Sequence, residues 1–221
     1  MQHYKGNGFV TTEAIVLIGG GGHCRACIDV IEAANKFRIA GIVDIKEKKG
    51  TSVLGYDIFA DDEDLPSLVS DYGNFLIAVG QTGSSYRRQQ LFVTLKKLNA
   101  CLPVIISPCA HVSKYAEIGE GTIIMNGTLI NAGVRIGKNC IINTAAVIEH
   151  DSVIGDHCHI STGCVVNGEC NVGNGALLGS NSVISNNITI AVETIIGAGS
   201  VVIGSIEDSG TYVGAPARKI K

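Results

Sequence analysis

An aliphatic residue recurs at every sixth position through the second half of the chain, without an exception. The series holds sixteen residues, namely Val112, Ile118, Ile124, Ile130, Ile136, Ile142, Ile148, Ile154, Ile160, Val166, Val172, Leu178, Ile184, Ile190, Ile196 and Val202. A six-residue repeat with an aliphatic first position is typical of a parallel β-helix. If each side of the prism takes one hexad, a coil needs about eighteen residues, and successive coils lie roughly 4.8 Å apart. The period therefore predicts a three-sided prism.

A small residue stands four positions after most of these aliphatic residues. The set is Ala116, Thr122, Thr128, Cys140, Ala146, Ser152, Cys158, Cys164, Cys170, Ala176, Ser182, Thr194 and Ser200. We expect one aliphatic and one small side chain per side to point into the prism. Four of the eight cysteines belong to this set, and cysteine packs well as a small buried hydrophobe. Their position indicates packing, not chemistry.

Cys24 and Cys27 form a C-x-x-C pair ahead of the repeat. No second pair stands at zinc-site spacing, so we predict no metal site, and the role of these two cysteines stays open.

The length of the chain and the place of the repeat predict two domains. Residues 1–106 have a different pattern, and residues 107–221 hold the prism and a C-terminal extension. Residues 1–13 are polar and lack the apolar core of a signal peptide, and no stretch reaches the roughly 18 apolar residues of a membrane span. We expect a cytoplasmic protein. A formal net charge of −3 without a basic run argues against a nucleic-acid partner.

The first domain alternates apolar runs with helical patterns. Strands are expected at 14–18, 40–43, 75–79 and 100–106, and helices at 24–35, 61–70 and 84–99. This alternation predicts a Rossmann-like parallel sheet, which binds ligands at the carboxyl ends of its strands.

A run of four glycines, from Gly19 to Gly22, follows the first strand and precedes His23. It departs from the dinucleotide fingerprint because the third glycine is replaced, so a nicotinamide cofactor is not expected. Glycines at a helix N-terminus still let backbone N–H groups approach a pyrophosphate. Asp44, about twenty residues further on, is placed to accept hydrogen bonds from a ribose or a pyrimidine ring. The alternative is a turn that merely packs a strand on a helix.

One histidine of the repeat stands outside the interior positions. His150 is flanked by Glu149 and Asp151, and imidazole is a natural general base at neutral pH when a carboxylate orients it. Gly168 comes eighteen residues later, so it should lie directly over His150, where it leaves room for a ligand and offers a backbone N–H to an oxyanion.

A second pair of residues should share another wall of the prism. Asn143 and His159 are sixteen residues apart, nearly one coil, whereas His159 is nine residues from His150, half a coil. The two histidines therefore point away from each other within one chain. If both serve one reaction, the site lies between two prisms, most simply in a homotrimer.

Four stretches together resemble one family. They are the hexads, the segment Leu17-Ile18-Gly19-Gly20-Gly21-Gly22-His23, the segment from Ile142-Asn143-Thr144 to Ile148-Glu149-His150-Asp151, and the closing Gly214-Ala215-Pro216-Ala217-Arg218. The chain is similar along nearly its whole length to the left-handed β-helix acetyltransferases. That group includes the bacterial N-acetyltransferases of nucleotide-linked 4-amino sugars and the sialic acid O-acetyltransferases.

The resemblance implies a homotrimer that uses acetyl-CoA. It implies His150 as the catalytic base and Asp151 as the acid that orients it. Asn143, His159 and Gly168 would then contact acetyl-CoA, and Gly21, Gly22, His23 and Asp44 the nucleotide sugar. It also implies left-handed coiling, which the period alone does not fix.

Three functions stay open at this point. The first is transfer of acetyl to the amine of a nucleotide-linked 4-amino-4,6-dideoxy sugar in bacterial surface glycan biosynthesis, which we favour because an acid follows His150 and the glycine turn keeps His23. The second is O-acetylation of a sialic or related nonulosonic acid, which the segment 161–168 resembles equally. The third is a catalytically silent scaffold, since stacked coils are stable without chemistry.

Overall fold

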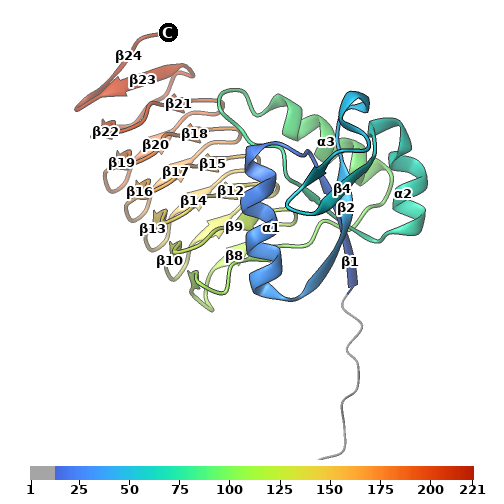
Figure 1. Ribbon diagram of the computed structural model, residues 1–221. Coiled ribbons are helices and arrows are strands. Elements are labelled where there is room, and N and C mark those ends of the chain that lie inside the picture. The colour runs from blue at the N-terminus through green and yellow to red at the C-terminus, as the bar shows by residue number, and fades with distance from the viewer. Residues whose placement is uncertain (1–12) are drawn as a thin grey trace, which may run out of the picture.

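The computed structural model describes residues 13–221, so the polar segment that precedes residue 13, with His3, lies outside the described residues. Figure 1 shows two parts, a small α/β unit and a long stack of short strands that carries the C-terminus at its far end. None of the helices in the described range is long and apolar enough to cross a bilayer.

The α/β unit holds a five-stranded sheet in the order β3-β4-β2-β1-β5. Its strands are β1 (Glu13–Ile18), β2 (Phe37–Val43), β3 (Ser52–Val53), β4 (Tyr56–Ala60) and β5 (Asn74–Ile77), and its helices are α1 (Gly22–Ala34), α2 (Leu65–Asp71) and α3 (Tyr86–Lys97). Two short 3₁₀ helices, η1 (Lys46–Lys48) and η2 (Asp62–Asp64), lie beside them. The sheet is parallel except for β3, which pairs antiparallel with β4.

Two elements differ from the sequence prediction. The β3–β4 hairpin was not predicted, because its strands are short and the turn at Leu54–Gly55 separates them without a marked apolar run. The strand expected at 100–106 was wrong as part of this sheet. Cys101 makes one isolated bridge to Asn74, and only β6 (Ile105–Ile106) is a strand, which pairs with the prism.

The prism consists of three sheets that repeat every three strands and are parallel except for one antiparallel pair at the C-terminal end. Sheet I holds β7 (His111–Val112), β10 (Leu129–Ile130), β13 (Val147–Ile148), β16 (Val165–Val166), β19 (Val183–Ile184) and β22 (Val201–Val202). Sheet II holds β8 (Glu117–Ile118), β11 (Arg135–Ile136), β14 (Val153–Ile154), β17 (Asn171–Val172) and β20 (Thr189–Ile190). Sheet III holds β6, β9 (Ile123–Ile124), β12 (Ile141–Ile142), β15 (His159–Ile160), β18 (Leu177–Leu178), β21 (Ile195–Ile196), β23 (Thr211–Gly214) and β24 (Ala217–Lys219).

The register confirms the predicted coil. Ile130 pairs with Ile148, and Ile148 with Val166, so eighteen residues separate stacked positions. Each aliphatic residue of the repeat ends one of the strands from β7 to β22. The small residues four positions later are buried except Ala116, which is partly buried. Cys140, Cys158, Cys164 and Cys170 are therefore core residues, as expected.

Helix α1 lies between the sheet and the prism (Figure 1). Cys24, Cys27 and Ile28 pack in one cluster with Ile15 of β1 and with Ile123 and Ile141 of the prism. Helices α2 and α3 cover the other face of the sheet through Leu65, Leu68, Leu91 and Leu95. The α/β unit and the prism thus share an apolar core, which fixes the loops at the carboxyl ends of the strands against sheet III.

Candidate active site

The glycine turn leaves open space at the start of α1. The helix begins at Gly22, and no side chain caps it. A Cβ added at Gly21 or Gly22 would meet no atom within 4 Å, and both residues are exposed. Backbone N–H groups at a helix N-terminus favour an anionic group such as a phosphate. The turn therefore leaves the N-terminus of α1 open to an anionic group.

Asp44 follows β2 and holds this turn in place. Its Oδ2 accepts hydrogen bonds from the Gly20 N–H at 2.7 Å and from Lys48 Nζ at 2.8 Å, and its Oδ1 accepts one from the Ile45 N–H at 2.7 Å. Burial opposes ionisation, but the hydrogen bonds from Lys48, Ile45 and Gly20 leave the pKa of Asp44 below its usual value. The carboxylate thus shapes the turn itself, besides any contact with a ligand.

His23 lies in the first turn of α1, close to Gly80. Burial, together with the nearby Arg88 and His159, lowers the pKa of His23 to about 3. Its Nε2 is buried and has no hydrogen-bond partner among the described residues. The imidazole of His23 is therefore neutral, and its Nε2 is unpaired within the described range. It lies at the seam, the contact region between the α/β unit and the prism.

The two cysteines of this helix point into the core and not into the turn. Burial raises the pKa of Cys24 to about 12 and raises that of Cys27 as well. Because the thiolate is the nucleophilic form of cysteine, neither residue is suited to covalent catalysis.

Asn143 and His159 meet on the wall of the prism that faces this seam. Asn143 Nδ2 lies 3.1 Å from His159 Nε2, and the Asn143 Oδ1 accepts the Thr144 N–H at 2.8 Å. His159 is buried, and its Nδ1 lies 2.7 Å from the carbonyl oxygen of Gln81 in the β5–α3 connection. Burial, together with Arg88, holds the pKa of His159 below its usual value. The α/β unit thus covers one side of this imidazole.

His150 and Asp151 stand in the open at the corner between sheets I and II. His150 Nδ1 lies 2.9 Å from Asp151 Oδ2, and the two side chains are 55% and 64% exposed. The hydrogen bond to Asp151 raises the pKa of His150, and the charges of Asp151, Glu149 and Glu169 act in the same direction. A carboxylate only accepts, so Nδ1 carries the proton and Nε2 is free to accept one.

Gly168 is buried directly beneath this ring. A Cβ added to it would stand 2.8 Å from His150 Nε2. The Gly168 N–H makes no hydrogen bond to another of the described residues.

The predicted site residues therefore form two groups within one chain. His23, Asn143 and His159 gather at the seam between the α/β unit and sheet III, whereas His150, Asp151 and Gly168 lie at the corner of sheets I and II, half a coil away. Gln81 and Arg88, which support the seam, were not predicted from the sequence. Arg88 comes three residues before Leu91 and seven before Leu95, so it lies on the apolar face of the helix. An arginine on such a face is the sequence signal by which Arg88 could have been found.

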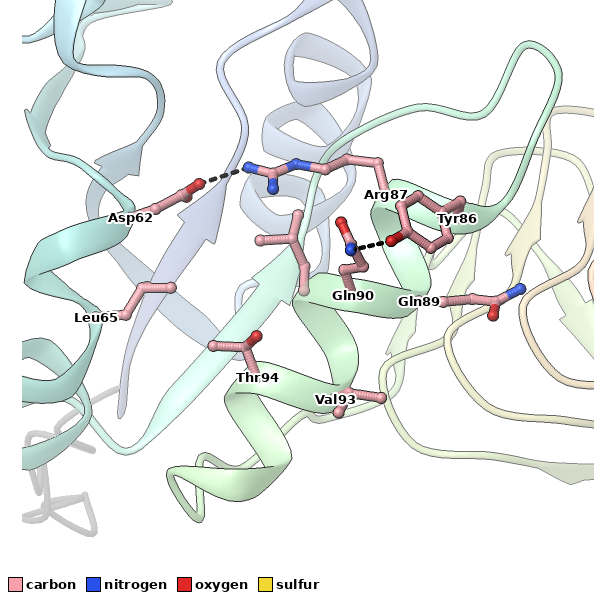
Figure 2. A pocket seen from close by; sticks show the side chains of 9 residues that line it. Asp62, Leu65, Tyr86, Arg87, Gln89, Gln90, Val93 and Thr94 are labelled. Atoms are coloured by element: carbon pink, nitrogen blue, oxygen red, sulfur yellow. Dashed lines mark hydrogen bonds and ion pairs between the residues drawn. The ribbon is translucent and has the colours of Figure 1, made fainter.

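A cavity of about 510 Å³ lies elsewhere, between α2 and the outer face of α3. Figure 2 shows Arg87 reaching across it to an ion pair with Asp62, with Tyr86, Gln90 and Val93 along the helix. It contains none of the residues that the sequence analysis singled out.

Family models divide the chain in the same way. One described as the PglD N-terminal domain matches residues 14–95, and one described as bacterial transferase hexapeptide (six repeats) matches residues 133–168. A curated relative, UDP-N-acetylbacillosamine N-acetyltransferase of Bacillus subtilis (strain 168), is 40% identical over 115 residues, which are 50% of this chain and 50% of the relative. The match thus spans half the length of that relative.

Two solved structures are similar over nearly the whole length. PerB from Caulobacter crescentus, solved in complex with CoA and GDP-perosamine, has 35% identity and a TM-score of 0.88 over 94% of this chain and 97% of that chain. The acetyltransferase domain of PglB from Neisseria gonorrhoeae FA1090, in complex with acetyl coenzyme A, has 29% identity and a TM-score of 0.87 over 95% and 100%. The predicted family and fold are confirmed: the prism is a left-handed parallel β-helix, and the chain belongs to the acetyl-CoA-dependent sugar acetyltransferases with a PglD-type N-terminal domain.

Proposed function

We propose that this protein transfers the acetyl group of acetyl-CoA to the amine of a nucleotide-linked 4-amino-4,6-dideoxy sugar, with His150 as general base. The observation that carries the proposal is the pair His150–Asp151, whose hydrogen bond leaves an exposed Nε2 as proton acceptor. The relatives include a UDP-N-acetylbacillosamine N-acetyltransferase and a perosamine N-acetyltransferase. By the family resemblance, the product belongs to the synthesis of a bacterial surface glycan.

The reaction is a direct transfer. The sugar amine attacks the thioester carbonyl, a C–N bond forms, and the C–S bond breaks as CoA leaves as the thiolate, which is then protonated by the imidazolium of His150. His150 Nε2 takes the proton that the amine must lose, and Asp151 holds the ring and stabilises the imidazolium. No cysteine takes part. In this proposal the free N–H of Gly168 contacts the acetyl-CoA thioester, where it stabilises the developing oxyanion.

The remaining residues are proposed to hold the two substrates. Asn143 and His159 contact the acetyl end of acetyl-CoA. Asn143 Nδ2 donates one hydrogen to His159, and its second hydrogen is available for the acetyl group. Gly21, Gly22, His23 and Asp44 bind the nucleotide sugar, with its diphosphate at the N-terminus of α1. The open space at both glycines supports this assignment.

A homotrimer would join the two groups of site residues. An apolar column runs along the outer face of sheet I and is only partly buried, namely Leu129, Val147, Val165, Val183 and Val201. A continuous apolar column on a surface is typical of an interface. In this proposal a second copy of the chain packs on the apolar column of sheet I. The seam of that second copy then lies next to His150, at the edge of the same sheet.

A thiol-release assay with acetyl-CoA tests the reaction. The acceptors are UDP-, dTDP- and GDP-linked 4-amino sugars and free sialic acids. We expect release with one of the nucleotide-linked amino sugars. Release with sialic acid alone would replace the proposal by O-acetylation, and no release with any acceptor would favour a scaffold.

Substitution of the base tests the mechanism. His150→Ala should lower kcat by about 10²- to 10⁴-fold while acetyl-CoA binding, measured by calorimetry, is retained. Near-normal turnover of His150→Ala would overturn the assignment of the base. A fully active monomer in sedimentation would overturn the shared site.

A further inference from the structure

Arg88 of α3 is a buried cation without a counter-ion. The side chain is 1% exposed, and no carboxylate of the described residues lies within ion-pair distance of it. Burial lowers the pKa of Arg88 to about 10, so the guanidinium is charged at neutral pH. A buried charge is costly unless its hydrogen bonds are made. This position therefore calls for a reason other than packing.

The guanidinium joins the end of β5 to the prism. Nη1 donates hydrogen bonds to the carbonyl oxygens of Ile77 at 2.8 Å and Val79 at 2.6 Å. Nη2 donates to the Asn139 carbonyl oxygen at 3.0 Å and to Asn139 Oδ1 at 2.8 Å. One side chain thus fixes the point where the chain leaves the sheet toward α3, relative to a corner of the β-helix.

Gln81 stands two residues beyond Val79 on this fixed segment. It is 3% exposed, and its Nε2 donates to the Gly175 carbonyl oxygen at 3.3 Å. Its own carbonyl oxygen lies 2.7 Å from His159 Nδ1. A carbonyl oxygen only accepts, so Nδ1 of His159 carries the proton, and Nε2 of the neutral ring is the acceptor.

That tautomer decides how Asn143 is oriented. Nε2 accepts from Asn143 Nδ2, while Asn143 Oδ1 accepts from the Thr144 N–H. A second proton on His159 would face the Nδ2 donor and would force the amide to flip, with loss of the Thr144 hydrogen bond. The orientation of Asn143 therefore depends on a neutral His159.

Unsatisfied polar atoms gather around the same segment. Among the described residues, the buried side-chain atoms without a partner are His23 Nε2, Gln81 Oε1, Arg88 Nε and Thr194 Oγ1. The first three belong to α1, to the β5–α3 connection and to α3. Buried polar groups are normally paired, so each of these exceptions requires an explanation.

We propose that Arg88 is a positioning residue for acetyl transfer: it fixes the β5–α3 connection so that the Gln81 carbonyl holds His159 as the neutral Nδ1–H tautomer, which orients Asn143. This inference rests on the proposed function of Asn143 and His159. The charged or titratable groups near His159 are Arg88 of α3 and His23 of α1, and the Arg88 charge lowers the pKa of both histidines.

The test compares Arg88→Met with Arg88→Lys. Arg88→Met should lower kcat about tenfold or more, with a smaller change in KM for either substrate, and ¹⁵N spectra of labelled imidazoles should lose the single Nδ1–H signature of His159. Arg88→Lys keeps the charge and should restore part of both. Sedimentation and thermal unfolding show whether each variant is folded. A folded Arg88→Met with unchanged kcat, or with lowered kcat and an unchanged His159 tautomer, overturns the proposal.

Asn139→Asp keeps the test decisive if Arg88→Met does not fold. It places a carboxylate where Oδ1 now accepts from Arg88 at 2.8 Å. The compensated charge should move the NMR titration of His159 and the acid limb of the kcat profile together to higher pH, and a titration or an acid limb that stays in place overturns the inference. Wild-type protein that acetylates no acceptor but keeps the Nδ1–H signature of His159 would refute the proposed function and leave the positioning of His159 standing.

Discussion

Gly168 lies beneath the imidazole of His150, one coil further along the β-helix, with no space for a side chain between them. A Cβ at residue 168 would stand 2.8 Å from both Cε1 and Nε2 of that ring. Real Cβ atoms do not approach so closely, so any larger residue must displace His150. The ring is exposed and free to move, so the consequence falls on activity and not on stability.

Gly168→Ala should therefore lower kcat/KM by up to about 100-fold, because a shift of about 1 Å in a catalytic group has effects of that size. Thermal unfolding should change little. Gly73→Ala is the control, since a Cβ there meets no atom within 4 Å. The measurement is the initial rate of thiol release. Equal rates for the two variants would refute the role of His150 as general base.

Gly133 has the same relation to Asp151. It lies in the left-handed region with φ +76°, and a Cβ there would collide with Asp151 Oδ1, whereas a Cβ at Gly127, with φ +69°, would only touch Ala145 at 3.9 Å. Both alanine variants should lose about 1–2 kcal/mol of stability from the strained φ. Only Gly133→Ala should also lose activity, roughly tenfold or more. Urea unfolding measures the loss of stability, and initial rates measure the loss of activity. Equal activities of the two variants would show that the position of Asp151 does not matter for the reaction.

The prism was predictable in detail because its constraint is local and repeated. Each hexad must place one aliphatic and one small side chain in the interior of the β-helix. The spacing in sequence therefore predicts that Gly168 stacks on His150 and that Asn143 lies near His159. Arg88 and Gln81 were not predictable in this way. Their partners lie in other elements, 51 and 78 residues away for Asn139 and His159, and no period connects those positions. The β3–β4 hairpin was missed for a different reason, because its strands are short and carry no marked apolar run.

His23 should make the protein sensitive to acid. Its pKa is about 3 in the folded state against about 6.5 in an unfolded chain. Between these values the unfolded chain binds a proton that the folded protein does not, so stability falls as pH falls, by about 1.4 kcal/mol for each pH unit from this group. His23→Gln should flatten the decline in unfolding free energy below pH 6.5, measured by urea titration at several pH values. An identical slope in both proteins would contradict the burial of a neutral His23.

Asp151 should set the pH dependence of the reaction. Its hydrogen bond and charge raise the pKa of His150, and the base acts only when neutral, so kcat/KM should fall as pH drops through that raised pKa. Asp151→Asn removes the charge, lowers the pKa of His150, and should move the acid limb of the kcat/KM profile to lower pH. The plateau should fall by about tenfold or more, since an amide neither stabilises the imidazolium nor fixes its tautomer. Profiles of both proteins with the same acceptor provide the measurement, with Glu149→Gln as the control for a neighbouring carboxylate that makes no hydrogen bond to the ring. An acid limb that stays in place, or moves to higher pH, would show that another group is the base.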